Sequence, residues 1–182
     1  MPFDFKKLEL EGLVLIEPKV FTDERGFFLE SYKKSDFLKY NINSEFVQDN
    51  HSVSKKNVIR GLHYQHAPKA QGKLVRAIRG TIWDVAVDIR RGSRTFLKSY
   101  FVELSDKKNN MLFIPPGFAH GFAALTDDAH LVYKCTEEYD QALDAGIRWD
   151  DSDIGVKWPV DNPIISVKDM ALPYSKNAKL FD

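Results

Sequence analysis

Two of the five histidines stand where a functional imidazole would be expected. His63 ends the run 60–63, late in an expected strand and beside the cation of Arg60. His120 lies between a rigid proline–glycine segment, 115–117, and a second glycine, Gly121. An imidazole titrates near neutral pH, so both residues are candidates for proton transfer. A lone histidine in a β protein, however, is more often a hydrogen-bonded structural group.

The histidines do not have the spacing of a metal site. His63 and His66 are three residues apart, so the alternation of a strand sends their rings to opposite faces. No Glu follows them, and Lys73 would add a positive charge near the site. We therefore predict that no metal is bound.

The remaining candidates are a tyrosine and several cations. Tyr133 shares one strand face with Leu131 and Cys135, where the ordinary expectation is a packed aromatic ring. Arg25 stands at a glycine turn, where the backbone could approach a ligand. The chain has no phosphate-binding loop, nucleophile elbow or dinucleotide fingerprint, and its single cysteine has no adjacent histidine. A histidine, a tyrosine and cations suit proton transfer beside a polarised carbonyl, with an anionic ligand held by Arg and Lys.

Short alternating segments would position these residues. Thr81–Ile89 is the clearest, because Trp83, Val85 and Val87 alternate with Asp84 and Ala86. Gly80 predicts a tight hairpin turn before it. The other expected strands are Leu13–Val20, Phe27–Tyr32, Glu45–Ser52, Val58–Tyr64, Lys73–Arg79, Leu97–Leu104, Asn110–Ile114 and Ala129–Thr136. These patterns predict an all-β fold of mostly antiparallel strands, and leave a sandwich, a barrel and a double-sheet jelly roll open.

Few helices are expected. One short helix is predicted over Lys34–Tyr40, with Ser35 or Asp36 near its cap. From Tyr139 onward, three prolines predict loops with brief helical turns.

Composition sets limits on the class of protein. The 182 residues fit one domain, 1–182, and are 43% hydrophobic and 29% charged. Lys plus Arg (26) equals Asp plus Glu (26), so the protein lacks the net positive charge that would attract nucleic acid. A single cysteine allows no intrachain disulfide, and no apolar run is long enough to span a membrane. With no signal-peptide pattern at the N-terminus, the cytoplasm is the expected compartment.

Nine short runs, in order along nearly the whole chain, together resemble the dTDP-4-dehydrorhamnose 3,5-epimerase family. They are Asp23-Glu24-Arg25-Gly26-Phe27-Phe28, Gln48-Asp49-Asn50, Arg60-Gly61-Leu62-His63-Tyr64-Gln65, Gln71-Gly72-Lys73-Leu74-Val75, Asp84-Val85-Ala86-Val87-Asp88, Gly117-Phe118-Ala119-His120-Gly121, Tyr133-Lys134-Cys135-Thr136, Gly146-Ile147-Arg148-Trp149 and Ser166-Val167-Lys168-Asp169.

The resemblance implies a cupin-type jelly-roll barrel, usually a homodimer, that uses neither a metal nor a nucleotide cofactor. By position, His63 matches the general base and Asp169 its orienting carboxylate, Lys73 the group that stabilises the enolate, and Tyr133 the proton donor. The matches to substrate-binding positions are Arg25, Glu30, Gln48, Asp49, Asn50, Arg60, Lys73, His120, Asp144 and Lys168, and Tyr139 matches the aromatic that stacks on thymine. The substrate implied is a dTDP-linked 4-keto-6-deoxy sugar.

Two features of this sequence complicate that match. Asp144 stands where the family usually has Glu, one methylene longer. Arg60 and His63 should also face opposite sides of a regular strand, so we expect a bulge at Gly61 that turns both into one pocket. Three alternatives stay open: a relative that inverts only C3 or acts on another 4-keto nucleotide sugar, a noncatalytic sugar-nucleotide-binding cupin, and a metal-dependent cupin oxygenase.

Overall fold

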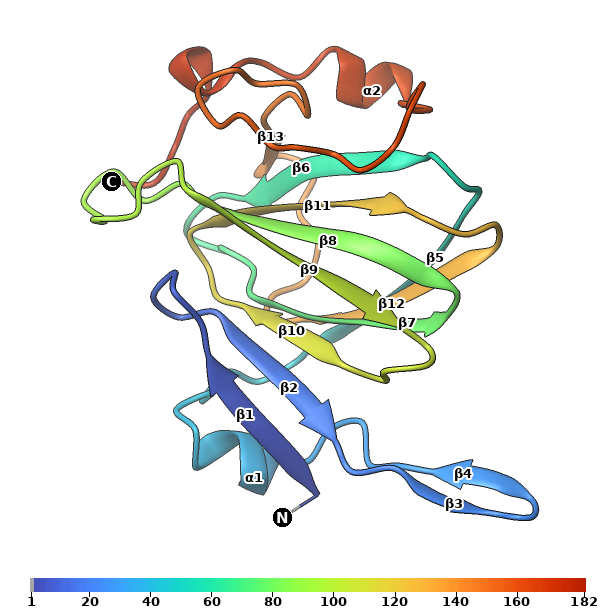
Figure 1. The fold of residues 1–182 in the computed structure, drawn as a ribbon. Helices are drawn as coiled ribbons and strands as arrows, with labels where there is room; N and C mark the ends of the chain where they lie inside the picture. The colour runs from blue at the N-terminus through green and yellow to red at the C-terminus, as the bar shows by residue number, and fades with distance from the viewer. Residues whose placement is uncertain (1) are drawn as a thin grey trace.

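The computed structural model describes residues 2–182 and places most strands in two sheets that face each other (Figure 1). The six-stranded sheet has the order β1-β2-β10-β7-β12-β5, and the five-stranded sheet the order β13-β6-β11-β8-β9. Strands β3 and β4 form a separate hairpin. All the strand pairs described are antiparallel, as predicted. The arrangement is a double-sheet jelly roll, which confirms the all-β class.

The elements have the following bounds. The strands are β1 Phe3–Lys7, β2 Val14–Pro18, β3 Phe21–Asp23, β4 Gly26–Phe28, β5 Gln48–Ser54, β6 Ile59–Gln65, β7 Lys73–Arg79, β8 Thr81–Asp88, β9 Ser99–Ser105, β10 Met111–Ile114, β11 Phe118–Ala124, β12 Ala129–Cys135 and β13 Asp144–Gly146. The helices are α1 Lys34–Leu38 and α2 Val167–Met170, with a 3₁₀ turn at Ser175–Asn177. No helix within residues 2–182 is long and apolar enough to cross a membrane.

Strand β8 shows how the sequence pattern builds the barrel. Ile82 and Ala86 point into the apolar cluster between the two sheets. Val85 and Val87 point to the other side, into a second cluster that the C-terminal segment covers with residues such as Leu180. The predicted alternation is confirmed. Both faces are buried because the segment after β13 packs over the five-stranded sheet, as Figure 1 shows.

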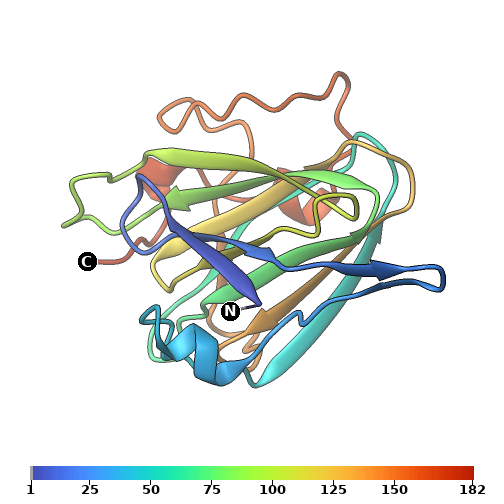
Figure 2. The same cartoon turned by 60° about the horizontal axis from the view of Figure 1, so that its bottom comes forward.

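A third apolar cluster lies on the outer face of the six-stranded sheet. Helix α1 places Phe37 there, edge-on to Phe3 and Phe5 with ring centroids 5.4 and 5.2 Å away. Helix α1 therefore covers the β1 end of this face, which Figure 2 turns toward the viewer. The rest of the face remains open beside β5 and β12.

Several local expectations need correction. The sequence patterns missed β1, β3, β11 and β13, and the strand expected over Phe27–Tyr32 is the shorter β4, Gly26–Phe28. All seven residues of β11 are buried, so this strand has no polar alternation to reveal it. Helix α1 ends at Leu38, and its N-cap is Lys33, whose side chain makes no capping hydrogen bond. The tight turn at Gly80 exists, with φ +73°, but it is not a hairpin. It carries the chain from β7 in one sheet to β8 in the other.

Candidate active site

A cavity of about 280 Å³ opens between the two sheets. Side chains from both sheets and from α2 line it: Ser52, Arg60, His63, Lys73, His120, Phe122, Leu131, Tyr133, Lys168 and Asp169. The cavity thus brings together all four residues predicted to be catalytic, of which Lys73 is also a predicted binding residue, and three further binding candidates, Arg60, His120 and Lys168.

His63 and Asp169 form a hydrogen-bonded pair in this cavity. His63 Nε2 lies 2.8 Å from Asp169 Oδ1, and the backbone N–H of Gly61 donates to Asp169 Oδ2 at 3.3 Å. Burial works to raise the pKa of Asp169, but its hydrogen bonds from His63, Gly61 and Ser166 outweigh that effect and lower the pKa. The ionised carboxylate therefore accepts a hydrogen bond from the protonated Nε2 of His63. In the neutral ring, the free lone pair is then on Nδ1.

A bulge at Gly61 explains how Arg60 and His63 share the cavity. Opposite β11, His63 pairs with His120 and Arg60 pairs with Phe122, so β6 holds one residue more than its partner over this stretch. Gly61 adopts φ +128°, a conformation that side chains with a Cβ rarely reach. The expected bulge is confirmed. Arg60 is anchored there by hydrogen bonds to Ser54 Oγ and the carbonyl of Val53.

His120 is the cross-strand neighbour of His63 and has its own carboxylate. Its Nε2 lies 2.8 Å from Oδ2 of Asp84, a residue with no exposed surface. Within residues 2–182, the second carboxylate oxygen of Asp84 has no hydrogen-bond partner. The cavity therefore contains two imidazole–carboxylate pairs side by side.

Lys73 and Tyr133 enter from the six-stranded sheet. Lys73 is 9% exposed, its Nζ lies 3.5 Å from the carbonyl oxygen of His63, and burial lowers the pKa of its ammonium group. Burial also raises the pKa of Tyr133, so the hydroxyl keeps its proton at neutral pH. The imidazole of His63 and the phenol of Tyr133 thus face one cavity from opposite sheets.

The remaining binding candidates on this side of the sheet are linked around the rim. Lys168 Nζ donates to Asp144 Oδ2 at 2.5 Å, and the Tyr139 hydroxyl donates to the same oxygen at 3.2 Å. Gln48 accepts from the Tyr139 backbone and donates to Asn50 at 3.0 Å. Although it is shorter than Glu, Asp144 reaches both of its neighbours.

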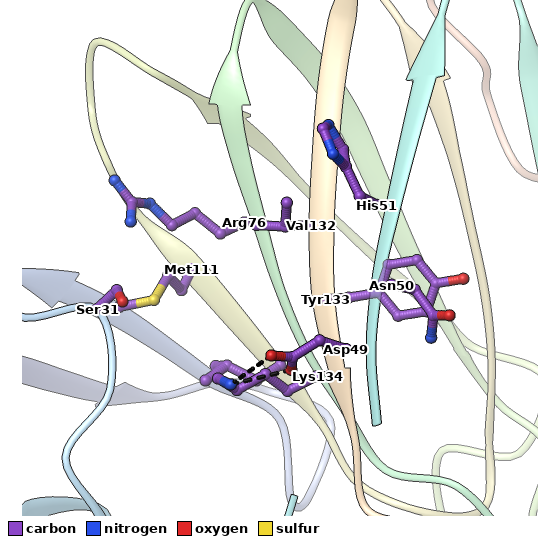
Figure 3. A pocket seen from close by; sticks show the side chains of 10 residues that line it. Ser31, Asp49, Asn50, His51, Arg76, Met111, Val132, Tyr133 and Lys134 are labelled. Atoms are coloured by element: carbon purple, nitrogen blue, oxygen red, sulfur yellow. Dashed lines mark hydrogen bonds and ion pairs between the residues drawn. The ribbon is translucent and has the colours of Figure 1, made fainter. Parts of the chain in front are cut away.

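Asp49 lies on the other face of β5. It forms an ion pair with Lys134 at 2.9 Å, and Figure 3 shows this pair on one side of the strands while Asn50 and Tyr133 project from the other. Because strand neighbours alternate, Asp49 cannot share the face of Asn50. The structure therefore does not bring the Asp49 side chain to the cavity of its own chain.

Arg25 and Glu30 are also outside the cavity. Arg25 lies at the tip of the β3–β4 hairpin, where it bonds Asp23 and its side chain is 83% exposed. Glu30 follows the hairpin, 3.9 Å from Lys33 Nζ. Figure 1 shows the hairpin projecting away from the barrel. Within one chain, neither residue lines the cavity that contains His63.

Sequence reasoning did not assign two residues that support the site. The sequence pattern places Asp84 on one face of its strand but predicts no role for it. Nothing in the sequence distinguishes Asp84 from Asp88 on the same face. Ser166 caps α2, its Oγ accepting from the Asp169 backbone at 3.0 Å. The Ser-x-x-Asp spacing at 166–169 is a signature of a helix N-terminus and was a usable signal.

The possible metal ligands of the chain are dispersed. Among residues 2–182, no three His, Cys, Asp or Glu side chains come together as a metal site would require. His66 packs against Tyr64 and Phe181, with ring centroids 5.2 and 5.7 Å away, on the far side of β6 from His63. The site is therefore built from acid–base and charged groups.

The fold is a cupin-type barrel whose two sheets enclose a cavity lined by titratable side chains. The family model described as dTDP-4-dehydrorhamnose 3,5-epimerase matches residues 7–177. The chain belongs to that family.

Individual relatives carry the family's name or a closely similar one. The dTDP-4-dehydrorhamnose 3,5-epimerase of Methanothermobacter thermautotrophicus is 52% identical over 170 residues, covering 92% of this chain and 91% of the relative. The crystal structure of the Sulfolobus tokodaii enzyme of that name superposes with a TM-score of 0.94 at 47% identity, over 100% of both chains. A dTDP-6-deoxy-D-glucose-3,5-epimerase from Legionella pneumophila, solved with dTDP-4-keto-L-rhamnose, gives a TM-score of 0.94 at 40% identity, over 97% and 95%.

Proposed function

We propose that this chain inverts C3 and C5 of dTDP-4-dehydro-6-deoxy-D-glucose to give dTDP-4-dehydro-L-rhamnose, a step of dTDP-L-rhamnose biosynthesis. The observation that carries the proposal is one cavity in which His63 and Tyr133 face each other from opposite sheets, with the buried Lys73 beside them. The ligand in the Legionella pneumophila structure, a dTDP-linked keto sugar, supports this choice of substrate.

The first step is removal of a proton beside the C4 ketone. The free Nδ1 of His63 takes the proton from C3, and the C–H electron pair moves to the C4 oxygen as an enolate. The Asp169 carboxylate, 2.8 Å from Nε2, stabilises the imidazolium that forms. The Lys73 ammonium stabilises the enolate oxygen. Because C3 and C5 both flank C4, one cation serves both inversions.

The second step returns a proton to the opposite face of the same carbon. Tyr133 donates its hydroxyl proton to C3, the C4 carbonyl re-forms, and the carbon is inverted. The neighbouring charge of Arg60 favours the phenolate that remains, since it lowers the pKa that burial raises. The imidazolium of His63 then gives up its extra proton to solvent and the phenolate of Tyr133 takes one up, and the same cycle acts at C5.

We further propose a homodimer in which the hairpin of one chain completes the cavity of the other. Its support is that Arg25 and Glu30 match binding positions yet lie on or beside a projecting hairpin. Phe27 and Phe28 on that hairpin are 60% and 65% exposed, more apolar surface than an isolated hairpin should present to water. A second copy would cover these rings and bring Arg25 to the pyrophosphate.

We also propose that 1–182 form one domain, because the C-terminal segment packs onto the barrel. Each chemical step proposed above uses side chains and no cofactor. The cytoplasmic location stays a prediction from the sequence.

Proton NMR in heavy water tests the function. With dTDP-4-dehydro-6-deoxyglucose, we expect the chain to exchange both H3 and H5, and His63→Ala to abolish exchange at both carbons. His66→Ala is the matched control, because this histidine packs outside the cavity and its loss should leave exchange intact.

The other outcomes separate the alternatives. Exchange at C3 alone would place the chain with relatives that invert only C3. No exchange at either carbon would contradict the epimerase and favour a noncatalytic sugar-nucleotide-binding protein.

A further inference from the structure

Lys73 poses an electrostatic problem that its own contacts do not solve. On β7 it shares a face with Val75 and Ala77, which point into the apolar cluster between the sheets. Burial there disfavours the ammonium form, and its nearest polar contact is a neutral carbonyl at 3.5 Å. A group that must be charged to stabilise an enolate needs a negative charge nearby.

Most of the acidic groups around Lys73 are already paired or neutral. Asp169 is paired with His63, and Asp144 with Lys168 at 2.5 Å. Burial raises the pKa values of Cys135 and Tyr133 and keeps both groups neutral at physiological pH. Asp169 is bound through both of its oxygens, by His63 and by the Gly61 backbone, so among these groups no buried carboxylate oxygen is left free.

The other cationic groups that face the cavity already have their own hydrogen-bond partners. Arg60 is bonded to Ser54 and Val53, and Lys168 holds Asp144. The two imidazoles each have a carboxylate partner.

Asp84 is the acid that remains. It lies on β8 between Ile82 and Ala86, so it points into the same space between the sheets as Lys73. One oxygen accepts from His120 at 2.8 Å, and within residues 2–182 the other oxygen has no partner. A fully buried carboxylate with a free oxygen is costly unless its charge does something for a neighbour.

We propose that Asp84 is a positioning residue: its carboxylate fixes the ring of His120 in the cavity and supplies the negative charge that keeps Lys73 protonated. Only the catalytic consequence rests on the proposed function, since the protonation of Lys73 is a property of the free protein. The two imidazole–carboxylate pairs of the cavity then have different tasks. Asp169 supports the base His63, and Asp84 supports the enolate-binding cation Lys73.

Titration of Lys73 tests this directly and without substrate. In protein labelled with ¹³C at lysine Cε, the signal lost in Lys73→Arg identifies Lys73, and its shift is followed against pH. In Asp84→Asn we expect the midpoint to fall by about one pH unit or more, because removal of a nearby negative charge disfavours the ammonium form. In Asp84→Glu, which keeps the negative charge, the Lys73 midpoint should stay close to the wild-type value.

Asp88→Asn is the matched control. Asp88 is equally buried on the same face of β8 but is bound by Arg90, Ser93 and Thr95, so its loss should leave the Lys73 midpoint in place. If Asp84→Asn does not fold, Asp84→Ser removes the same charge with a smaller side chain, and the same fall is expected. A folded variant without the charge, but with an unchanged Lys73 midpoint, would overturn the inference.

Catalysis gives a second readout. The alkaline limb of kcat for H3 exchange should move to lower pH in Asp84→Asn, in step with the Lys73 midpoint. If the wild-type chain exchanged neither H3 nor H5, the proposed function would fail while the lysine titration still decided the role of Asp84.

Discussion

At the scale of single residues, the two proposed proton-transfer groups have different surroundings. His63 is held by a buried carboxylate, whereas burial raises the pKa of Tyr133 and the charge of Arg60 works to lower it. The proposed mechanism has the imidazole accept a proton and the phenol donate one. Two substitutions test these roles separately.

Tyr133→Phe removes the proton donor and leaves the base in place. We expect H3 of the substrate still to exchange with heavy water, because His63 can return a solvent-derived deuteron to the face from which it took the proton. The inverted product should be lost, or fall at least a hundredfold. Following exchange and epimer formation by proton NMR in the same tube checks this. Loss of both signals in a folded variant would mean that Tyr133 does more than donate.

Asp169→Asn keeps the size of the side chain but removes the charge behind His63. The amide can also bond the ring in the wrong tautomer, so we expect kcat to fall by roughly 10²–10⁴ with little change in KM. Asp150→Asn is the control, since Asp150 forms a carboxylate–arginine pair with Arg148 away from the cavity. Steady-state kinetics of both variants decide it, and a rise in KM alone would assign Asp169 to substrate binding.

At the scale of elements, the glycine bulge in β6 fixes the geometry of the site. A Cβ on Gly61 would lie 2.6 Å from the Cα of Gly121 and 3.0 Å from the carbonyl oxygen of His120. Gly61→Ala should therefore push β6 away from β11 and displace His63. We expect loss of several kcal/mol of stability and of nearly all activity. Urea unfolding and the exchange assay measure the two effects.

Gly26→Ala separates backbone strain from crowding. Gly26 has the same φ, +128°, but a Cβ there would meet nothing within 4 Å. Its cost should be that of the conformation alone, on the order of 1 kcal/mol. Equal losses of stability in the two variants would show that contact with β11 is not what makes Gly61 necessary.

The loop after β8 carries a pH-dependent part of the stability. Burial works to raise the pKa of Asp88, but hydrogen bonds from Arg90, Ser93 and Thr95 lower it to about 2. Asp88 therefore stabilises the fold above about pH 4, and the contribution is lost as pH falls through 2. In urea unfolding between pH 5 and 2, the wild type should lose about 2 kcal/mol more than Asp88→Asn. Parallel pH profiles would contradict this.

The sequence predicted the elements whose pattern is local and missed those that depend on packing. Strand β8 alternates cleanly and was predicted almost to its ends, whereas β11 is buried throughout and carries no period. The pair of His63 and Asp169 spans 106 residues, so only the resemblance could join them. The unpaired oxygen of Asp84 could not be predicted, because it depends on which strands become neighbours.

At the scale of the whole molecule, the barrel holds the chemistry and the hairpin extends beyond it. The barrel contains His63, Lys73 and Tyr133, but Arg25 is carried away on β3–β4. If the hairpin completes the cavity of a second copy, each working site takes His63 from one chain and Arg25 from the other. This division of residues between two chains can be tested by mixing variants.

Arg25→Ala and His63→Ala should each be nearly inactive as homodimers, the first for loss of substrate binding and the second for loss of the base. When equal amounts are unfolded together and refolded, random pairing makes about half of the dimers mixed. In a mixed dimer, one site combines the intact His63 of one chain with the intact Arg25 of the other, so activity should return to about a quarter of the wild-type value. The H3 exchange assay measures this recovery, and refolding each variant alone is the control. If the two residues acted within one chain, every site would lack one of them and no activity would return, so the hairpin would have to reach its own barrel by another conformation.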